Sequence, residues 1–267
     1  MSELSPREMR LRIRAGAWQR PTAGCCRDFA QANLVVVPKE LAYDFLLFCQ
    51  RNPKPCPLLE LTTPGDFEPR GLAPGADLRT DLPRYRVYRH GELEGEVTDL
   101  LSVWRDDLVS FLLGCSFTFE WALQAAGIPV RHLEEGVNVP MYITDRACEP
   151  VGLFAGPLVV SMRPIPSYMV ARAAEVTARF PLAHGEPVHI GDPGAIGIAD
   201  IGRPDFGDAV SMRLDETPVF WACGVTPQAV AMCAKPELMI THAPGHMLVS
   251  DRGHAELSDL STSESTA

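Results

Sequence analysis

Residues 32–38, ANLVVVP, form a continuous apolar run closed by a proline, a pattern typical of a strand that is buried on both faces. The following segment, 39–52, places its large apolar side chains on one face of a helix. A second short apolar run, at 57–61, ends at the turn TPGD. This strand–helix–strand order predicts an α/β fold with a parallel core.

Capping and turn signals divide the rest of the N-terminal half. The motif SPRE at residues 5–8 is a capping box and predicts a short helix after it. Period-two alternation over 84–97 predicts a hairpin. A helix is expected over 98–114, and a second one begins at Cys115-Ser116.

The middle of the chain changes in character and predicts a smaller α+β unit inserted into the first domain. Strands are expected there at 137–144, 156–165, 186–191 and 208–214, with a helix over 167–180. The α/β rhythm returns with a strand at 218–224, a helix at 226–236 and a strand and loop at 237–249. We therefore expect a larger discontinuous domain at 1–135 and 215–257, a smaller domain at 136–214, and a disordered tail at 258–267.

Composition excludes several functional classes. The 267 residues carry a formal net charge of −10 and no basic cluster, which argues against nucleic-acid binding. No apolar run is long enough to span a membrane, and the N-terminus resembles no secretion signal, so we expect a cytoplasmic protein. The eight cysteines fit no C-x-x-C pattern and are expected to be reduced thiols.

Two strand-to-helix junctions are candidate ligand sites. At Cys115-Ser116 a helix N-terminus would offer unpaired N–H groups to an anion and would lower the pKa of the thiol, although a buried, inert cysteine is equally compatible with the pattern. In WACGVTPQAV, residues 221–230, an apolar strand ends at Gly224 and Thr226 is a good N-cap. A capped helix without a ligand is the alternative there.

The histidine-rich segment ITHAPGHML, residues 240–248, places His242 and His246 around a Pro-Gly turn. That turn excludes a regular helix and no third ligand is evident, so we predict no metal site. Proton transfer, substrate binding and a structural role stay open for both histidines.

Two further segments carry polar groups. The glycine-rich stretch 189–208 contains His189, Asp192 and Arg203 but lacks the phosphate-loop and dinucleotide patterns, so no nucleotide cofactor is expected. It is either a functional loop or a turn-rich connector. Arg163 stands near the end of a predicted strand and would suit a substrate carboxylate, or an ion pair with an acidic side chain.

Taken together, GCSFTFE, NVPMY, VVSMRP, HIGDPGAIGI, WACGVTPQ and ITHAPGHM resemble, in this order, motifs of the D-glutamate cyclase family. The resemblance extends over nearly the whole chain. It implies a three-layer α/β/α sandwich domain with a smaller inserted two-layer α+β domain. It also implies a lyase that removes water, in the best-defined member by closing D-glutamate to 5-oxo-D-proline, without an agreed set of catalytic residues.

Such a cyclisation needs a base near the amine, an acid near the departing hydroxyl, donors for the oxyanion and a cation for the α-carboxylate. Acid and base could come from His189, His242, His246 or Glu120. Anion donors could come from Cys115-Ser116 or Gly224-Thr226, the cation from Arg163, and further substrate contacts from Asp192. A free carboxylate has no good leaving group to expel, so Cys115 is expected to line the site rather than act as a nucleophile.

The sequence thus predicts a cofactor-independent hydro-lyase for a small amino or hydroxy acid. Its expected partner is a small carboxylate-bearing substrate, with no nucleic acid and no membrane, and a homo-oligomer is compatible with the pattern. The alternative is a non-catalytic carboxylate-binding or accessory subunit of another enzyme.

Overall fold

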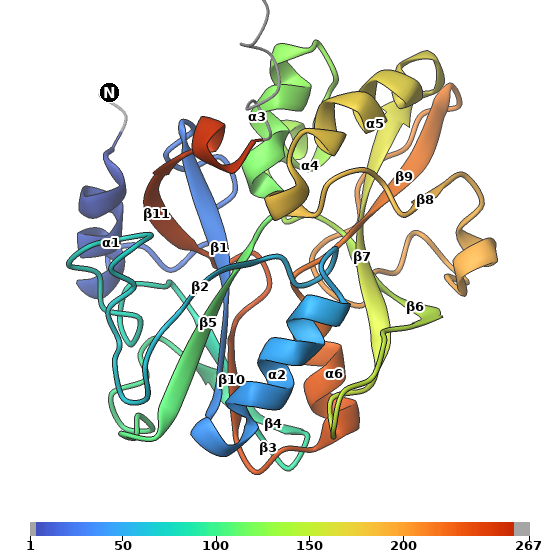
Figure 1. Cartoon of the computed structure of the whole chain (residues 1–267). Helices are drawn as coiled ribbons and strands as arrows, with labels where there is room; N and C mark the ends of the chain where they lie inside the picture. Colours follow the sequence, from blue (N-terminus) through green and yellow to red (C-terminus); the bar gives the residue numbers. More distant parts are fainter. Residues whose placement is uncertain (1–3, 259–267) are drawn as a thin grey trace, which may run out of the picture.

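The computed structural model describes residues 4–258 and has a mixed α/β architecture with two antiparallel sheets (Figure 1). The expected tail lies, from residue 259 on, outside the described residues. The α-helices are α1 (Pro6–Arg14), α2 (Lys39–Arg51), α3 (Phe117–Ala125), α4 (Arg131–Glu135), α5 (Val170–Ala178) and α6 (Thr226–Ala234). The 3₁₀ turns are η1 (Ser167–Met169), η2 (Pro181–Ala183), η3 (Pro193–Ile196) and η4 (His254–Leu257).

The larger sheet has seven strands in the order β2-β5-β1-β10-β3-β4, and β11 also pairs with β1. Its strands are β1 (Phe29–Pro38), β2 (Leu58–Leu61), β3 (Tyr85–Arg89), β4 (Glu92–Val97), β5 (Leu108–Gly114), β10 (Met239–His242) and β11 (Leu248–Gly253). The predicted first strand, the helix after it, the second strand and the hairpin are confirmed as β1, α2, β2 and the β3–β4 pair.

The prediction of a parallel core is wrong, because every strand pair among the described residues is antiparallel. Strands β1 and β2 are not neighbours: β5 lies between them and pairs antiparallel with both. The helix expected over 98–114 is also wrong, because Leu108–Gly114 is this central strand, buried along its whole length. A short apolar run fits a buried strand and a buried helix equally well, and this ambiguity hid the strand that separates β1 from β2.

Both faces of β1 are buried, which explains its uninterrupted apolar sequence. Val35 and Val37 pack with Phe45 and Phe48 of α2 on one face. Alternate residues of β1 pack on the other face among side chains of β3, β5, β10 and the 72–82 segment. The sheet therefore has an apolar layer on each side, as period-two side-chain alternation requires.

The smaller sheet has the order β6-β7-β9-β8. Its strands are β6 (Met141–Ala147), β7 (Pro157–Pro166), β8 (His189–Ile190) and β9 (Glu216–Ala222). The predicted strands at 137–144 and 156–165 and the helix over 167–180 correspond to β6, β7 and α5, whereas the expected strand at 208–214 is wrong, since no strand forms there. Although β9 belongs to the segment 215–257 that we expect in the larger domain, it pairs with β7 and β8.

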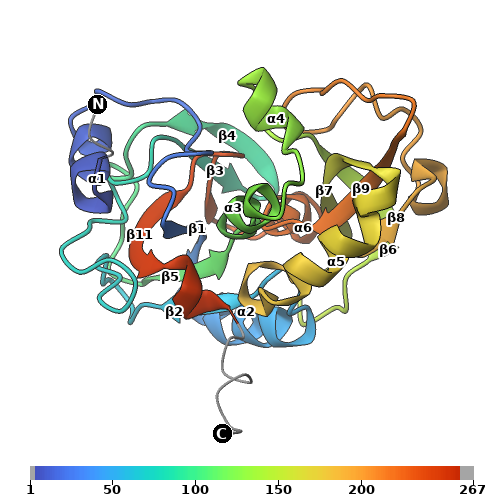
Figure 2. The same ribbon diagram turned by 90° about the horizontal axis from the view of Figure 1, so that it is seen from above.

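Helix α3 lies between the two sheets, as the view from above shows (Figure 2). Its Phe119 and Leu123 pack with Val176 of α5 and with Trp221 of β9. It begins directly after β5, at a point where Gly114 is required: a Cβ there would lie 1.6 Å from the carbonyl oxygen of Leu182. The junction β5–α3 is thus set between the larger sheet, the smaller sheet and the η2 turn.

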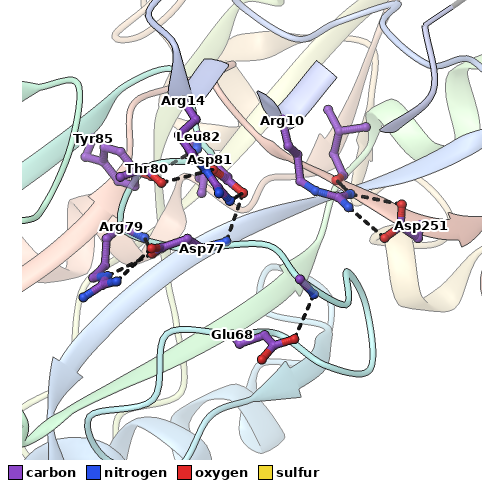
Figure 3. A network of polar contacts seen from close by, with 12 residues as sticks. Arg10, Arg14, Glu68, Asp77, Arg79, Thr80, Asp81, Leu82, Tyr85 and Asp251 are labelled. Carbon is purple, nitrogen blue, oxygen red and sulfur yellow. Dashed lines mark hydrogen bonds and ion pairs between the residues drawn. The ribbon is translucent and has the colours of Figure 1, made fainter. Parts of the chain in front are cut away.

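Charged pairs hold α1 to the larger sheet and to the loop before β3 (Figure 3). The expected capping box is present, with Ser5 and Glu8 bonded to each other. Arg10 donates to the Asp251 carboxylate at 3.1 and 2.8 Å, and Arg14 donates to Asp81 at 2.7 and 2.6 Å. No helix within residues 4–258 is long and apolar enough to cross a membrane.

Candidate active site

A buried group of charged and polar side chains lies where the two sheets meet. Glu120 lies in the first turn of α3, and Ser116 immediately precedes that helix. Ser161 and Arg163 lie on β7, two residues apart, so their side chains leave the same face of the strand. All four side chains are buried, and they come from segments more than 40 residues apart in the chain.

Arg163 is the centre of this group. Its Nε donates to Oε1 of Glu120 at 3.1 Å, and its Nη2 also bonds that oxygen. Nη2 donates to the Ser116 hydroxyl at 2.9 Å, and Nη1 donates to the Ser161 hydroxyl at 3.1 Å. The guanidinium carbon lies 5.2 Å and 5.5 Å from the ring centres of Phe119 and Trp221. Arg163 therefore forms an ion pair with an acidic side chain, Glu120. This is the alternative to binding a substrate carboxylate that the sequence left open.

His132 completes the group, and sequence reasoning missed it. It lies in the five-residue helix α4 and is 1% exposed. Its Nε2 is 3.2 Å from Oε1 of Glu120, an ion-pair distance, but without the alignment of a hydrogen bond. Its ring stacks near Phe117 with centres 6.2 Å apart. The local sequence RHLEE carries no motif that marks this histidine.

The charges around Glu120 determine its protonation. Burial alone would raise the pKa of the carboxyl, but the charges of His132 and Arg163 outweigh burial and hold that pKa below its ordinary value. Glu120 is therefore a carboxylate at neutral pH. A buried carboxylate beside an imidazole can accept a proton and then pass it to that ring, and such transfers are the elementary steps of acid–base catalysis.

Two adjoining cavities flank the Glu120–His132 pair. One, of about 340 Å³, is lined among others by Glu120, Gln31, Arg27 and Trp121. The other, of about 460 Å³, is lined among others by His132. Ala23 and Leu133 line both, so the two cavities meet at these residues. Each is within the usual range for small-molecule sites, about 300–1,000 Å³.

Cys115 lies beside this group, and burial outweighs the activating effect of the Arg163 charge on its thiol. Burial raises the pKa of its thiol well above the ordinary value, and the nearby Cys223 thiol adds to the effect. The first helical N–H, that of Phe117, points to the Cys115 sulfur at 3.5 Å. The thiol is therefore protonated at neutral pH and already accepts one of the N–H groups that the helix start could offer an anion.

The second predicted junction, β9–α6, is closed by internal contacts. A Cβ on Gly224 would lie 2.1 Å from the Asn33 side chain, which explains the glycine. Thr226 is the first residue of α6 and not its N-cap, which corrects the prediction. Its hydroxyl donates to the Cys223 carbonyl at 2.7 Å and accepts from the N–H of Val159 at 3.1 Å. Both residues are buried, and neither lines the two cavities.

The two histidines of the Pro-Gly turn lie apart from Glu120. His242 ends β10 in the interior of the larger sheet, and burial lowers the pKa of its imidazole to about 4. His246 is partly exposed, and its Nδ1 lies 3.0 Å from the Pro244 carbonyl. Burial lowers the pKa of this imidazole as well. Neither histidine lines the cavities beside Glu120.

The glycine-rich stretch begins at the outer edge of the smaller sheet, on β8 (Figures 1 and 2). His189 contacts the carbonyl of Asp192 at 2.7 Å, while the Asp192 carboxylate caps η3. Arg203 lies in the turn that follows. The end of the stretch does reach the site, since Asp208 lines the cavity that contains His132. Within residues 4–258 no three His, Cys, Asp or Glu side chains are grouped so as to hold a metal ion.

Comparison with known proteins places this chain in a family. A family model described as D-glutamate cyclase matches residues 109–251, which include Ser116, Glu120, His132 and Arg163. The chain belongs to the D-glutamate cyclase family. This membership confirms the resemblance that the sequence motifs indicated.

Two bacterial members of the family are similar to this chain over nearly their whole length. A protein of Stutzerimonas stutzeri described as "Putative hydro-lyase" is 64% identical over 249 residues, which cover 93% of this chain and 94% of that protein. A Bacillus subtilis protein described as "Putative hydro-lyase YcsI" is 61% identical over 248 residues, or 93% and 96% of the two chains. A nitrogen repressor-like protein of Methanococcus jannaschii aligns with a TM-score of 0.37 at 9% identity over 94% of this chain and 99% of that one, too low a likeness to support an argument.

Proposed function

We propose that this member of the D-glutamate cyclase family is a hydro-lyase that removes water from a small amino acid, and that its reaction is the closure of D-glutamate to 5-oxo-D-proline. The observation that carries the proposal is the buried Glu120 carboxylate, which borders a 340 Å³ cavity while contacting His132 and Arg163. The hydro-lyase descriptions of the relatives support the reaction class.

The reaction requires two protons to move. The substrate nitrogen attacks the γ-carboxyl carbon, a C–N bond forms and a C–O bond breaks. An ammonium nitrogen loses two protons on becoming a lactam N–H, and both leave with the departing oxygen as water. A catalyst therefore needs one group that accepts protons from nitrogen and another that delivers them to oxygen.

Glu120 and His132 suit these two roles. The ionised Glu120 accepts a proton from the amine and passes it to His132, which delivers it to the departing oxygen. Because Nε2 of His132 is 3.2 Å from Oε1 of Glu120, each of the two protons taken from the nitrogen can move from Glu120 to His132 and on to the oxygen. Arg163 acts here as a positioning residue, because its bonds to Glu120 fix that carboxylate and favour its charged form.

The substrate carboxylates need a cation at the same cavity. Arg27 lines the cavity that contains Glu120, and a guanidinium can bind a carboxylate through two parallel hydrogen bonds. In the adjoining cavity Arg20 lies over the Trp18 ring, 4.4 Å from its centre. Two cations at two adjoining cavities match a substrate with a carboxylate at each end.

The proposal is tested by incubating the purified protein with D-glutamate and following the formation of 5-oxo-D-proline by mass spectrometry. L-glutamate and a panel of hydroxy acids serve as comparisons. Formation of the lactam that is lost in Glu120→Gln and His132→Asn supports the proposal. Binding of these acids without turnover of any would instead favour the non-catalytic carboxylate-binding subunit.

A further inference from the structure

The side chain of Gln31 has one half of its amide bound and the other half free. Gln31 lies on β1, is 3% exposed and lines the same cavity as Glu120. Its Nε2 donates to the carbonyl oxygens of Thr22 and Cys25 at 2.8 and 3.2 Å. Its Oε1 has no hydrogen-bond partner among residues 4–258.

The orientation of this amide follows from its partners. Both contacted atoms are carbonyl oxygens, which only accept, so the amide nitrogen must face them. The opposite orientation would place three acceptors against one another. Oε1 is therefore the acceptor of Gln31 that is left without a donor among residues 4–258.

A buried acceptor without a donor is costly, and native proteins rarely keep one without a reason. Glu120, on the same cavity, is ionised and also only accepts. A ligand atom that donates one hydrogen bond to Gln31 and another to Glu120 must carry at least two hydrogens. An amine or ammonium does so, whereas a hydroxyl has a single hydrogen.

We propose that Gln31 is a specificity-determining residue, whose amide oxygen accepts a hydrogen bond from the substrate's amino group and so selects amino acids over hydroxy acids. This inference rests on the proposed function, since it assumes that the substrate binds beside Glu120. Glu120 and Arg27 alone would accept both amino acids and hydroxy acids. Gln31 is the residue that distinguishes these two substrate classes.

The test uses three ligands that cannot cyclise because they lack a γ-carboxyl group: D-2-aminopentanoate, D-2-hydroxypentanoate and pentanoate. Their dissociation constants are measured by NMR titration with the wild-type protein and with Gln31→Met. Gln50→Met, an exposed residue of α2, is the matched control. Thermal unfolding of each variant verifies that it is folded.

We expect the wild-type protein to prefer the amine over the hydroxyl ligand, and Gln31→Met to reduce this preference by about tenfold or more, the effect of one charge-assisted hydrogen bond. Loss of the Nε2 bonds to Thr22 and Cys25 would weaken the binding of all three ligands alike. The ratio of the amine and hydroxyl dissociation constants would then stay unchanged. Gln50→Met should leave every constant unchanged.

An unchanged ratio in Gln31→Met, the lack of any preference in the wild-type protein, or the failure of all three ligands to bind would overturn the role of Gln31. These outcomes are separate from the turnover assay. Lactam formation with an unchanged ratio would sink only the inference about Gln31, whereas an amine preference that depends on Gln31, without turnover of D-glutamate, would sink only the proposed reaction.

Discussion

Two groups of buried charges, around Glu120 and around Asp81, use the same chemistry for different ends. In each an arginine bonds a carboxylate that is almost wholly buried. At Asp81 both carboxylate oxygens have donors, from Arg14, from the Thr80 hydroxyl and from the N–H of Asp77 (Figure 3). Around Glu120, by contrast, Gln31 Oε1 and the His132 ring nitrogens have no hydrogen-bond partner within residues 4–258.

The difference teaches that a buried ion pair by itself does not indicate an active site. The Asp81 pair ties α1 to the loop before β3, and its hydrogen-bonding capacity is used within the protein. The Glu120 group lies at a cavity and keeps capacity for a ligand. Unused donors and acceptors at a cavity, rather than charge alone, distinguish the second case.

Glu120→Gln should give the largest effect. The amide keeps the shape of the side chain and an oxygen for Arg163, but it cannot accept a proton. We expect the rate of lactam formation to fall by about 10²–10⁴-fold, the usual contribution of an acid or base. Steady-state kinetics measure this, with circular dichroism to verify the fold. A variant that keeps more than about a tenth of the rate would remove Glu120 from the chemistry.

Mild acid should destabilise the protein through its buried histidines. Burial lowers the pKa of His184, near Arg163, and of His242 to about 4, against an unfolded value near 6.5. Between these values the unfolded chain binds more protons than the folded one, so the unfolding free energy falls as the pH falls from about 6.5 to 4.

At about pH 5 the loss amounts to about 2 kcal/mol for each of these histidines. Urea unfolding at pH 7 and at pH 5 measures the change. His184→Gln should show a smaller difference between the two pH values than the wild-type protein. An identical pH dependence in the two proteins would show that His184 takes up a proton in the folded state as readily as in the unfolded chain.

Asp81→Asn should affect stability and leave catalysis alone. It removes charge-assisted hydrogen bonds from Arg14, so we expect the unfolding free energy to drop by about 1–3 kcal/mol. The rate of lactam formation should stay within about twofold, because Asp81 does not line the cavities beside Glu120. A marked loss of rate in a folded Asp81→Asn protein would break the distinction between the two charge groups.

Cys115→Ala should have the smallest effect. Burial raises the pKa of this thiol, so it is not a nucleophile at neutral pH. We expect the rate to change by less than about threefold, far below the contribution of an acid or base. An inactive Cys115→Ala enzyme that is folded and still binds substrate would restore the cysteine as a covalent nucleophile.

Motif by motif, the sequence identified Ser116, Glu120 and Arg163 as candidates, and the structure brings these three together. The sequence did not identify His132, because RHLEE carries no motif. It did not identify Gln31 either, because this residue adjoins an apolar run that is typical of a core strand. Their importance arises from contacts with distant segments, which no local pattern reveals. The assignment of His189, His242 and His246 to acid–base chemistry stays a prediction.

By itself, the amino-acid sequence determined the family, the capping box of α1, the two-sided burial of β1 and most helices and strands, because these depend on neighbours a few residues apart. Only the tertiary structure decided that β5 enters between β1 and β2, and that Glu120 meets His132 and Arg163 beside a cavity. Strand order and the pairing of buried charges depend on which distant surfaces pack together, and the free energy of that packing belongs to the whole chain.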